Sequence, residues 1–148
     1  MAYTYDNGRN PLKPDWVQNG FSPETNEWVK SFGEDLTKSP KKGDVGRKAL
    51  TTGQLRKFFG KVKQIEADFI NKKSEIATLE YLLDYSVGRD KKKSKIVDFS
   101  EQLIIAIKFL NKNIDNKDIQ FYYKNFVKIF EAIVAYHKFY GGQESANN

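Results

Sequence analysis

The sequence has 148 residues, of which 39% are hydrophobic, and 25 Lys and Arg against 19 Asp and Glu give it a net charge of +6. This length suits one domain with one core, and the apolar share argues against a disordered chain. The absence of cysteine excludes disulfide scaffolds and thiolate metal sites and fits a reducing cytosol. The basic excess favours a polyanionic partner.

We expect a cytoplasmic protein that does not associate with membranes. The first residues, Met-Ala-Tyr-Thr-Tyr-Asp, lack the basic region and the apolar segment of a signal peptide. The longest purely apolar run covers residues 103–107, which is far shorter than the ~20 residues that a membrane-spanning helix needs.

Residues 1–21 are predicted to form an extended or mobile arm, because Tyr, Asn, Gly and Pro occur there without periodicity. Ser22 followed by Pro23 is typical of a helix start, with Ser22 as the N-cap. Apolar residues at helical spacing follow, namely Trp28, Val29, Phe32 and Leu36. The basic stretch 38–49 contains a proline and two glycines, so it predicts a loop.

The second predicted helix has the best start signal in the chain. Thr51 and Gln54 have the spacing of a capping box, in which each side chain bonds the backbone N–H of the other residue. One apolar face follows, made of Leu55, Phe58, Phe59, Val62, Ile65 and Phe69. This pattern predicts an amphipathic helix that packs along one side.

Three further helices are predicted at about 73–87, at about 97–112, and from Asp115 or Asn116 to Tyr140. Gly88 and Gly141 are expected to end the first and the last of them. No strand pattern competes with these helices. The sequence therefore predicts an all-α fold, a single compact bundle of about five helices over residues 22–142, with a disordered tail at 143–148.

No catalytic or metal-binding motif is convincing. Residues 43–48 lack the glycine spacing of a P-loop, and the Gly-Gly-Gln at 141–143 lies where a helix stop is expected. His137 is the only histidine, so it cannot join a histidine–cysteine metal cluster. Its place on the apolar stripe of the last helix favours a buried, hydrogen-bonded imidazole over a general base. We expect no enzyme activity and no cofactor.

Basic residues of the second helix form a candidate phosphate-contact surface. Arg56 and Lys63 lie on one flank of its apolar stripe, and Lys57 and Lys61 lie on the other. Gly60, between the flanks, would let a phosphate approach closely. An ordinary solvated face rich in lysine would give the same pattern.

Other features outside the core are also ambiguous. Arg47 and Lys48 directly precede the second helix, whose first-turn N–H groups attract anions. The basic loop at 91–95 is either a solvated loop or a nucleic-acid contact. Phe121 and Phe139 are predicted to project from the polar side of the last helix. Without flanking arginines they favour docking of a neighbouring subunit over stacking on bases.

Two stretches carry a family resemblance. Residues 49–58 read Ala-Leu-Thr-Thr-Gly-Gln-Leu-Arg-Lys-Phe, and residues 126–142 form an aromatic-rich segment containing Ala-Tyr-His-Lys. Their order and spacing resemble the small subunit of the type III-A CRISPR interference complex, the Csm complex. Gly53 departs from the family pattern, which has Ser at this position. Residues 1–45 are not covered by the resemblance.

The resemblance implies a helical, non-catalytic subunit that is present in several copies and serves antiviral defence. Such subunits stack along the ribonucleoprotein, contact other Csm subunits, and line the groove where guide RNA pairs with target RNA. By matching position, the implied RNA-facing residues are Gln54, Arg56 and Lys57, with Arg47 and Lys48 just outside the motif. Base pairing supplies sequence specificity, so contacts to the RNA backbone suffice.

Lys61 and Lys63 join these RNA-binding candidates through the helical periodicity alone. The alternative function is a helical protein–protein interaction module without direct nucleic-acid contact, in which the basic excess serves solubility. A DNA-binding regulator is a weaker possibility, because no helix presents base-reading polar residues at its N-terminus.

Overall fold

The computed structural model describes residues 2–38, 49–90 and 94–142, and helices make up most of this part of the chain. The elements are α1 (Pro14–Asn19), α2 (Pro23–Leu36), α3 (Thr52–Ala67), the one-turn α4 (Phe69–Lys72), the 3-10 turn η1 (Lys73–Glu75), α5 (Ile76–Arg89), α6 (Ile96–Lys112) and α7 (Ile119–Phe139). No strand occurs in the described ranges. The predicted all-α bundle is confirmed.

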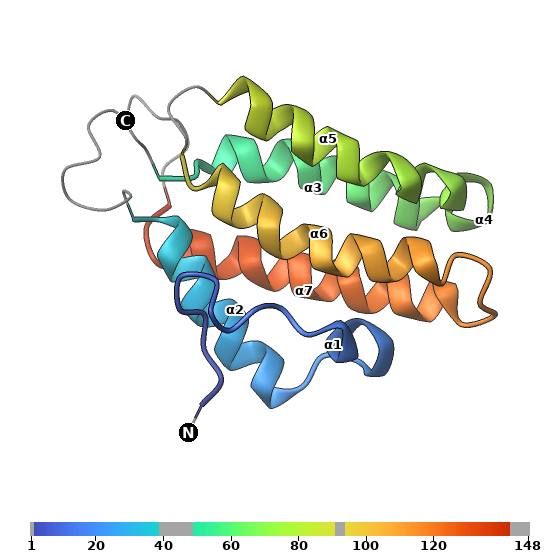
Figure 1. Ribbon diagram of the computed structural model, residues 1–148, viewed down its shortest axis with the longest axis horizontal. Coiled ribbons are helices and arrows are strands. Elements are labelled where there is room, and N and C mark those ends of the chain that lie inside the picture. Colours follow the sequence, from blue (N-terminus) through green and yellow to red (C-terminus); the bar gives the residue numbers. More distant parts are fainter. Residues whose placement is uncertain (1, 39–48, 91–93, 143–148) are drawn as a thin grey trace.

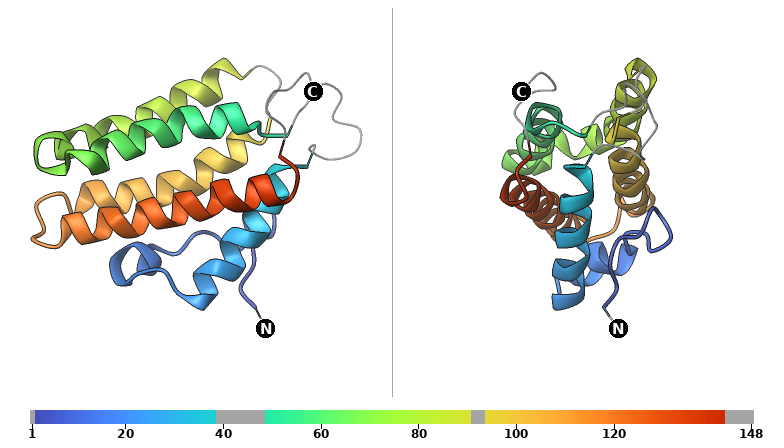
Figure 2. Two further views of the ribbon diagram at one scale, coloured as in Figure 1. Left: turned by 180° about the vertical axis from the view of Figure 1, so that it is seen from behind. Right: turned by 90° about the vertical axis from the view of Figure 1, so that its left-hand side faces the viewer.

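The long helices pack in two pairs, which α1 and α2 cover from one side (Figure 1). In the end-on view, α3 lies beside α7 and α5 lies beside α6, with α2 below them (Figure 2). α2 packs mainly on α7, and α1 packs on both α7 and α6. None of the described helices is long and apolar enough to cross a membrane.

Both predicted helix starts are confirmed, and the structure adds that Ser22, predicted as a simple N-cap, also forms a capping box. Ser22 caps α2 together with Thr25, and each residue's hydroxyl oxygen accepts the backbone N–H of the other. At α3, the Gln54 N–H donates to Thr51 Oγ1 at 3.1 Å, and the Thr51 N–H donates to Gln54 Oε1 at 2.9 Å. These bonds satisfy N–H groups that have no partner within the helix, which fixes where each helix begins.

The core lies where the predicted apolar stripes meet. The stripe of α2 is completely buried, and so are the core residues of α7, which include Phe126, Phe130 and Ile133. On α3, by contrast, Phe58 and Phe59 are only half-buried, although both rings pack on Phe130. The apolar face of α3 is thus not fully covered by the rest of the bundle.

The N-terminal segment differs from the predicted extended or mobile arm. Much of it lacks regular structure, but Pro14–Asn19 form α1, and Leu12, Trp16 and Val17 are buried in the shared core. A side chain of α6 also fixes the backbone of this segment, since Gln102 Oε1 accepts the Leu12 N–H at 2.9 Å. A six-residue helix has little stability of its own, so tertiary burial and not local pattern stabilises it.

Two predicted boundaries need correction. α5 does not stop at Gly88 but continues to Arg89, because Gly88 does not adopt the positive φ of a left-handed stop. α7 begins at Ile119, several residues later than expected. Gly141 does follow α7 with a φ of 87°, as predicted. The predicted loop at 39–48, Lys91 to Lys93 and the predicted tail at 143–148 lie outside the described residues.

Candidate nucleic-acid interface

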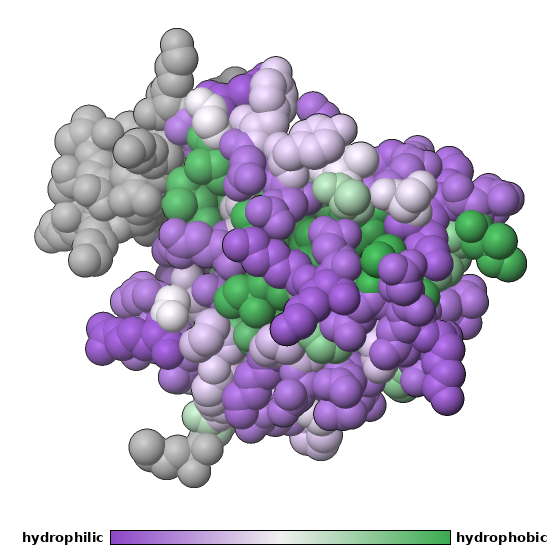
Figure 3. All heavy atoms as spheres, turned by 45° about the vertical axis from the view of Figure 1, so that its right-hand side comes forward, coloured by the Kyte–Doolittle hydropathy of each residue, from purple (hydrophilic) through white to green (hydrophobic). Residues whose placement is uncertain are grey.

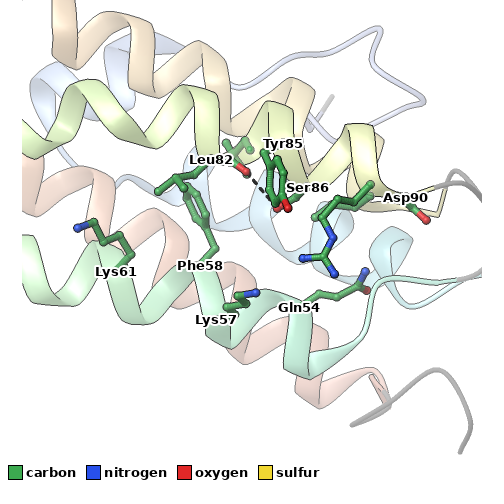
Figure 4. Close-up of a pocket in the computed structure, with 11 residues that line it drawn as sticks. Gln54, Lys57, Phe58, Lys61, Leu82, Tyr85, Ser86 and Asp90 are labelled. Carbon is green, nitrogen blue, oxygen red and sulfur yellow. Dashed lines mark hydrogen bonds between the residues drawn. The ribbon is translucent and has the colours of Figure 1, made fainter.

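A groove of about 540 Å³ runs between α3 and α5, and it contains three of the predicted RNA-binding residues (Figure 4). α3 contributes Gln54, Lys57, Phe58 and Lys61 to its lining. α5 and the residues that follow it contribute Leu82, Leu83, Tyr85, Ser86, Arg89, Asp90 and Ile96. The two helices join at their far end through α4 and η1, so the groove is the space between two sides of one hairpin.

The floor of the groove is apolar and fixed by packing. Phe58 stacks on Phe130 with ring centroids 5.9 Å apart and meets Phe99 edge-on at 6.5 Å. Leu83 and Ile96 are buried beside it. Because these side chains are anchored in the core, the floor keeps its shape without a ligand.

The basic residues on the rim of the groove differ in whether an acidic side chain already pairs with them. Lys61 donates a hydrogen bond to Glu75, which joins α3 to the turn before α5 and lowers the pKa of the Glu75 carboxyl below its usual value. Lys57 and Arg89 have no acidic partner within the described part of the chain. These two charges are therefore available to an anion.

The one carboxylate that lines the groove is already engaged. Asp90 Oδ2 accepts the backbone N–H and the hydroxyl of Ser94, each at 2.6 Å. Both bonds point the carboxylate toward the start of α6. Two donors therefore bind one oxygen of Asp90, whereas Lys57 and Arg89 have no acidic partner in the described chain.

Gln54 both caps the start of α3 and lines the groove, and different atoms of its side-chain amide serve the two roles. Its side-chain oxygen accepts the Thr51 N–H, so the oxygen is directed toward the helix start. The amide NH₂ has no partner in the described residues and lines the groove. The cap therefore leaves two N–H donors free for a ligand.

The other flank of α3 is separate from the groove. Arg56 is exposed and has no acidic partner among the residues described. Lys63 pairs with Glu66 at 2.8 Å, and this hydrogen bond raises the pKa of Lys63 above its usual value. Gly60 is exposed, and a Cβ built on it would meet nothing within 4 Å. Of the two predicted basic flanks, the one with Lys57 and Lys61 lines the groove, and Arg56 and Lys63 do not.

The sequence interpretation missed two groove residues, Tyr85 and Arg89. Tyr85 is 62% exposed, and the Arg89 guanidinium lies 5.6 Å from the centroid of its ring. Their spacing of four residues on a polar helix face was the available signal. Arg47 and Lys48, which were predicted to bind RNA, lie outside the described residues.

His137 has the structural role that its position predicted. It is fully buried, and its Nε2 lies 2.7 Å from the Leu50 carbonyl oxygen, so Nε2–H donates to this oxygen. Burial lowers the pKa of the imidazole below its usual value, although the bond to Leu50 opposes this effect. Within the described chain, no group of three or more His, Asp or Glu side chains could hold a metal ion.

Large apolar side chains also reach the surface, where Figure 3 shows separate hydrophobic patches on a mainly hydrophilic face. Phe121 is 50% exposed and Phe139 is 74% exposed, which confirms that both project away from the core. Tyr81, on α5, is 60% exposed and does not line the groove.

The fold and this site define a small all-helical protein with a basic groove beside its best-capped helix. The family model for Csm2 Type III-A matches residues 33–143. The chain belongs to this family of type III-A CRISPR proteins and is a small subunit of the Csm complex. Subunits of this family are generally non-catalytic and structural. No curated protein and no solved structure matches the chain.

Proposed function

We propose that this subunit binds the backbone of guide or target RNA without sequence preference and without catalysing a reaction, in the cytoplasm. The observation that supports this most is the pair of cations, Lys57 and Arg89, on the rim of one groove without acidic partners in the described chain. Family membership supplies the context of a ribonucleoprotein complex. Arg56 extends the basic surface along α3, and Gln54 adds neutral donors.

Phosphate contact alone is enough for this role. Lysine and arginine that meet phosphates release condensed counterions, which gives affinity that does not depend on sequence. In a guide–target duplex, specificity comes from base pairing, so the protein has only to hold and orient the strands. Lys61 and Lys63 contribute less, since each already pairs with a glutamate.

The direct test is the double substitution Arg56→Ala and Lys57→Ala. Both side chains are exposed, so the fold should be kept while RNA binding weakens. Lys108→Ala with Lys112→Ala removes the same charge from exposed positions of α6 and is the matched control. Equal binding by the Arg56 and Lys57 variant and by the control, with unchanged helical content, would remove α3 from the RNA surface.

Self-association along the complex and docking to other Csm subunits complete the proposal. Exposed Phe121 and Phe139 support protein contacts, because large rings on a surface are typical anchors of subunit interfaces. They equally favour the alternative function, a helical protein–protein interaction module that never touches nucleic acid. A tagged pull-down from the native host separates the two. Small guide RNAs recovered with other subunits support the RNA-binding role, and partner proteins without RNA support the alternative.

A further inference from the structure

We propose that the groove between α3 and α5 receives one unpaired nucleobase of a single-stranded RNA segment. This inference rests on the proposed RNA binding and makes it more specific. A surface that binds phosphates alone needs charge but no apolar cavity. Here the unpaired cations surround a cavity with an apolar floor, and that combination fits a nucleotide, which joins an apolar ring face to a phosphate.

The apolar part of the groove matches a base in character and in size. Phe58 points from α3 toward Leu82 of α5, and the exposed ring of Tyr85 stands beside them (Figure 4). The volume of about 540 Å³ lies within the roughly 300–1,000 Å³ of small-molecule sites. Aromatic rings with free faces are the usual platforms for unpaired bases, because every base has a π-face.

The polar part of the groove matches the edge of a base. The NH₂ of Gln54 is free to donate, since the capping box uses only the oxygen of this amide. The Ser86 hydroxyl donates to the Leu82 carbonyl oxygen at 3.1 Å, which leaves the lone pairs of the hydroxyl as acceptors. One side of the groove can thus donate to a base and another can accept from it.

Charge complementarity selects a nucleotide over an uncharged protein side chain as the occupant. Lys57 and Arg89 would meet the phosphates on either side of the inserted base. The Arg89 guanidinium already lies over one face of the Tyr85 ring, 5.6 Å from its centroid, so the base would stack on the other face. An apolar side chain from a partner protein would fill the floor but leave both cations without a counter-charge.

The test uses the full-length chain and a single-stranded RNA of about ten nucleotides, within the span of known single-strand sites. All positions are abasic except the centre, which carries either 2-aminopurine, a fluorescent base, or a further abasic residue, so the two strands have the same number of phosphates and differ by one base. The variants are Tyr85→Ala, Tyr85→Phe and, as a matched control, Tyr81→Ala, which removes an exposed tyrosine of α5 outside the groove.

We expect the strand with the base to bind about 5- to 150-fold more tightly than the abasic strand, as stacking of one base predicts. Tyr85→Ala should remove this difference, whereas Tyr85→Phe and Tyr81→Ala should keep it, and the fluorescence of 2-aminopurine should change on binding.

Each other result overturns the proposal in a distinguishable way. Equal, salt-sensitive binding of both strands would refute the base site and leave backbone binding intact. Binding of neither strand but of an RNA duplex of the same length would refute the base site alone, and binding of none of the three would refute the proposed RNA binding as well. An equal loss in Tyr81→Ala would place the stacking outside the groove. A Tyr85→Ala variant that binds RNA normally but no longer joins other Csm subunits would make the groove a protein-docking site.

Discussion

Gly33 marks the closest approach between α2 and α7, and its replacement by alanine is the sharpest test of the packing. A Cβ at this position would lie 2.7 Å from the Cβ of Tyr136 and 3.1 Å from the backbone nitrogen of His137. Carbon atoms pack best at about 3.5–4.0 Å, so the two helices would have to separate by roughly 1 Å. No flexible side-chain end is available to move aside instead.

That separation would strain contacts on both sides of the crossing. Tyr136 donates to Asn26 Oδ1 at 3.0 Å, and His137 donates to the Leu50 carbonyl oxygen at 2.7 Å. Overpacking of this kind costs roughly 1–3 kcal/mol, and the better helix propensity of alanine returns about 1 kcal/mol. We expect Gly33→Ala to lower the free energy of unfolding by up to ~2 kcal/mol.

Gly60→Ala is the matched control, because it is the same substitution inside a helix where nothing lies within 4 Å of the new Cβ. At this position the substitution changes only the helix propensity, so the free energy of unfolding should rise by about 0.5–1 kcal/mol. Urea denaturation measures both values, and thermal melts should shift by about 2–4 °C per kcal/mol in opposite directions. A Gly33→Ala protein as stable as the Gly60→Ala protein would refute the close α2–α7 packing.

Two further predictions concern stability. Because the pKa of folded His137 lies below the ~6.5 of an unfolded imidazole, the unfolded chain binds more protons in the window between the two values. The contribution of His137 to the free energy of unfolding should therefore be complete above pH 6.5 and decrease as the pH drops through this window. Denaturation at pH 7.5 and at pH 5.5 measures this decrease. The His137→Gln variant should lose the part of the pH dependence that comes from His137. Thr51→Ala removes the cap of α3 and should cost ~1 kcal/mol in urea denaturation, whereas Thr51→Ser should cost little; equal losses would mean that the hydroxyl does not act as a cap.

The parts of the fold that local chemistry determines could be predicted from the sequence. Ser22 and Thr51 start α2 and α3 because their hydroxyl groups bond residues only three positions away. Gly141 ends α7 because glycine accepts a positive φ. α1 could not be predicted, because it is stabilised by the burial of Trp16 and Val17 against helices far along the chain.

The candidate site, like the fold, could be predicted from the sequence only in part. Helical periodicity placed Lys57 and Lys61 on one flank of α3, and the groove contains both. Tyr85 and Arg89 lie across the groove from them because α3 packs on α7 and α5 packs on α6, and no local pattern encodes this packing. The bond between Lys61 and Glu75 likewise joins residues far apart in sequence, so the reduced availability of Lys61 could not be foreseen.

The salt dependence of RNA binding tests the central claim most directly. The affinity of the full-length chain for single-stranded RNA would be measured over a series of salt concentrations, for the natural sequence and for the Arg56→Ala, Lys57→Ala variant. Each lost phosphate contact reduces the slope of log K against log salt by about 0.7. We predict a steep slope for the natural chain and a slope shallower by up to about 1.4 for the variant. Absent binding, or a slope that the variant does not change, would contradict the account.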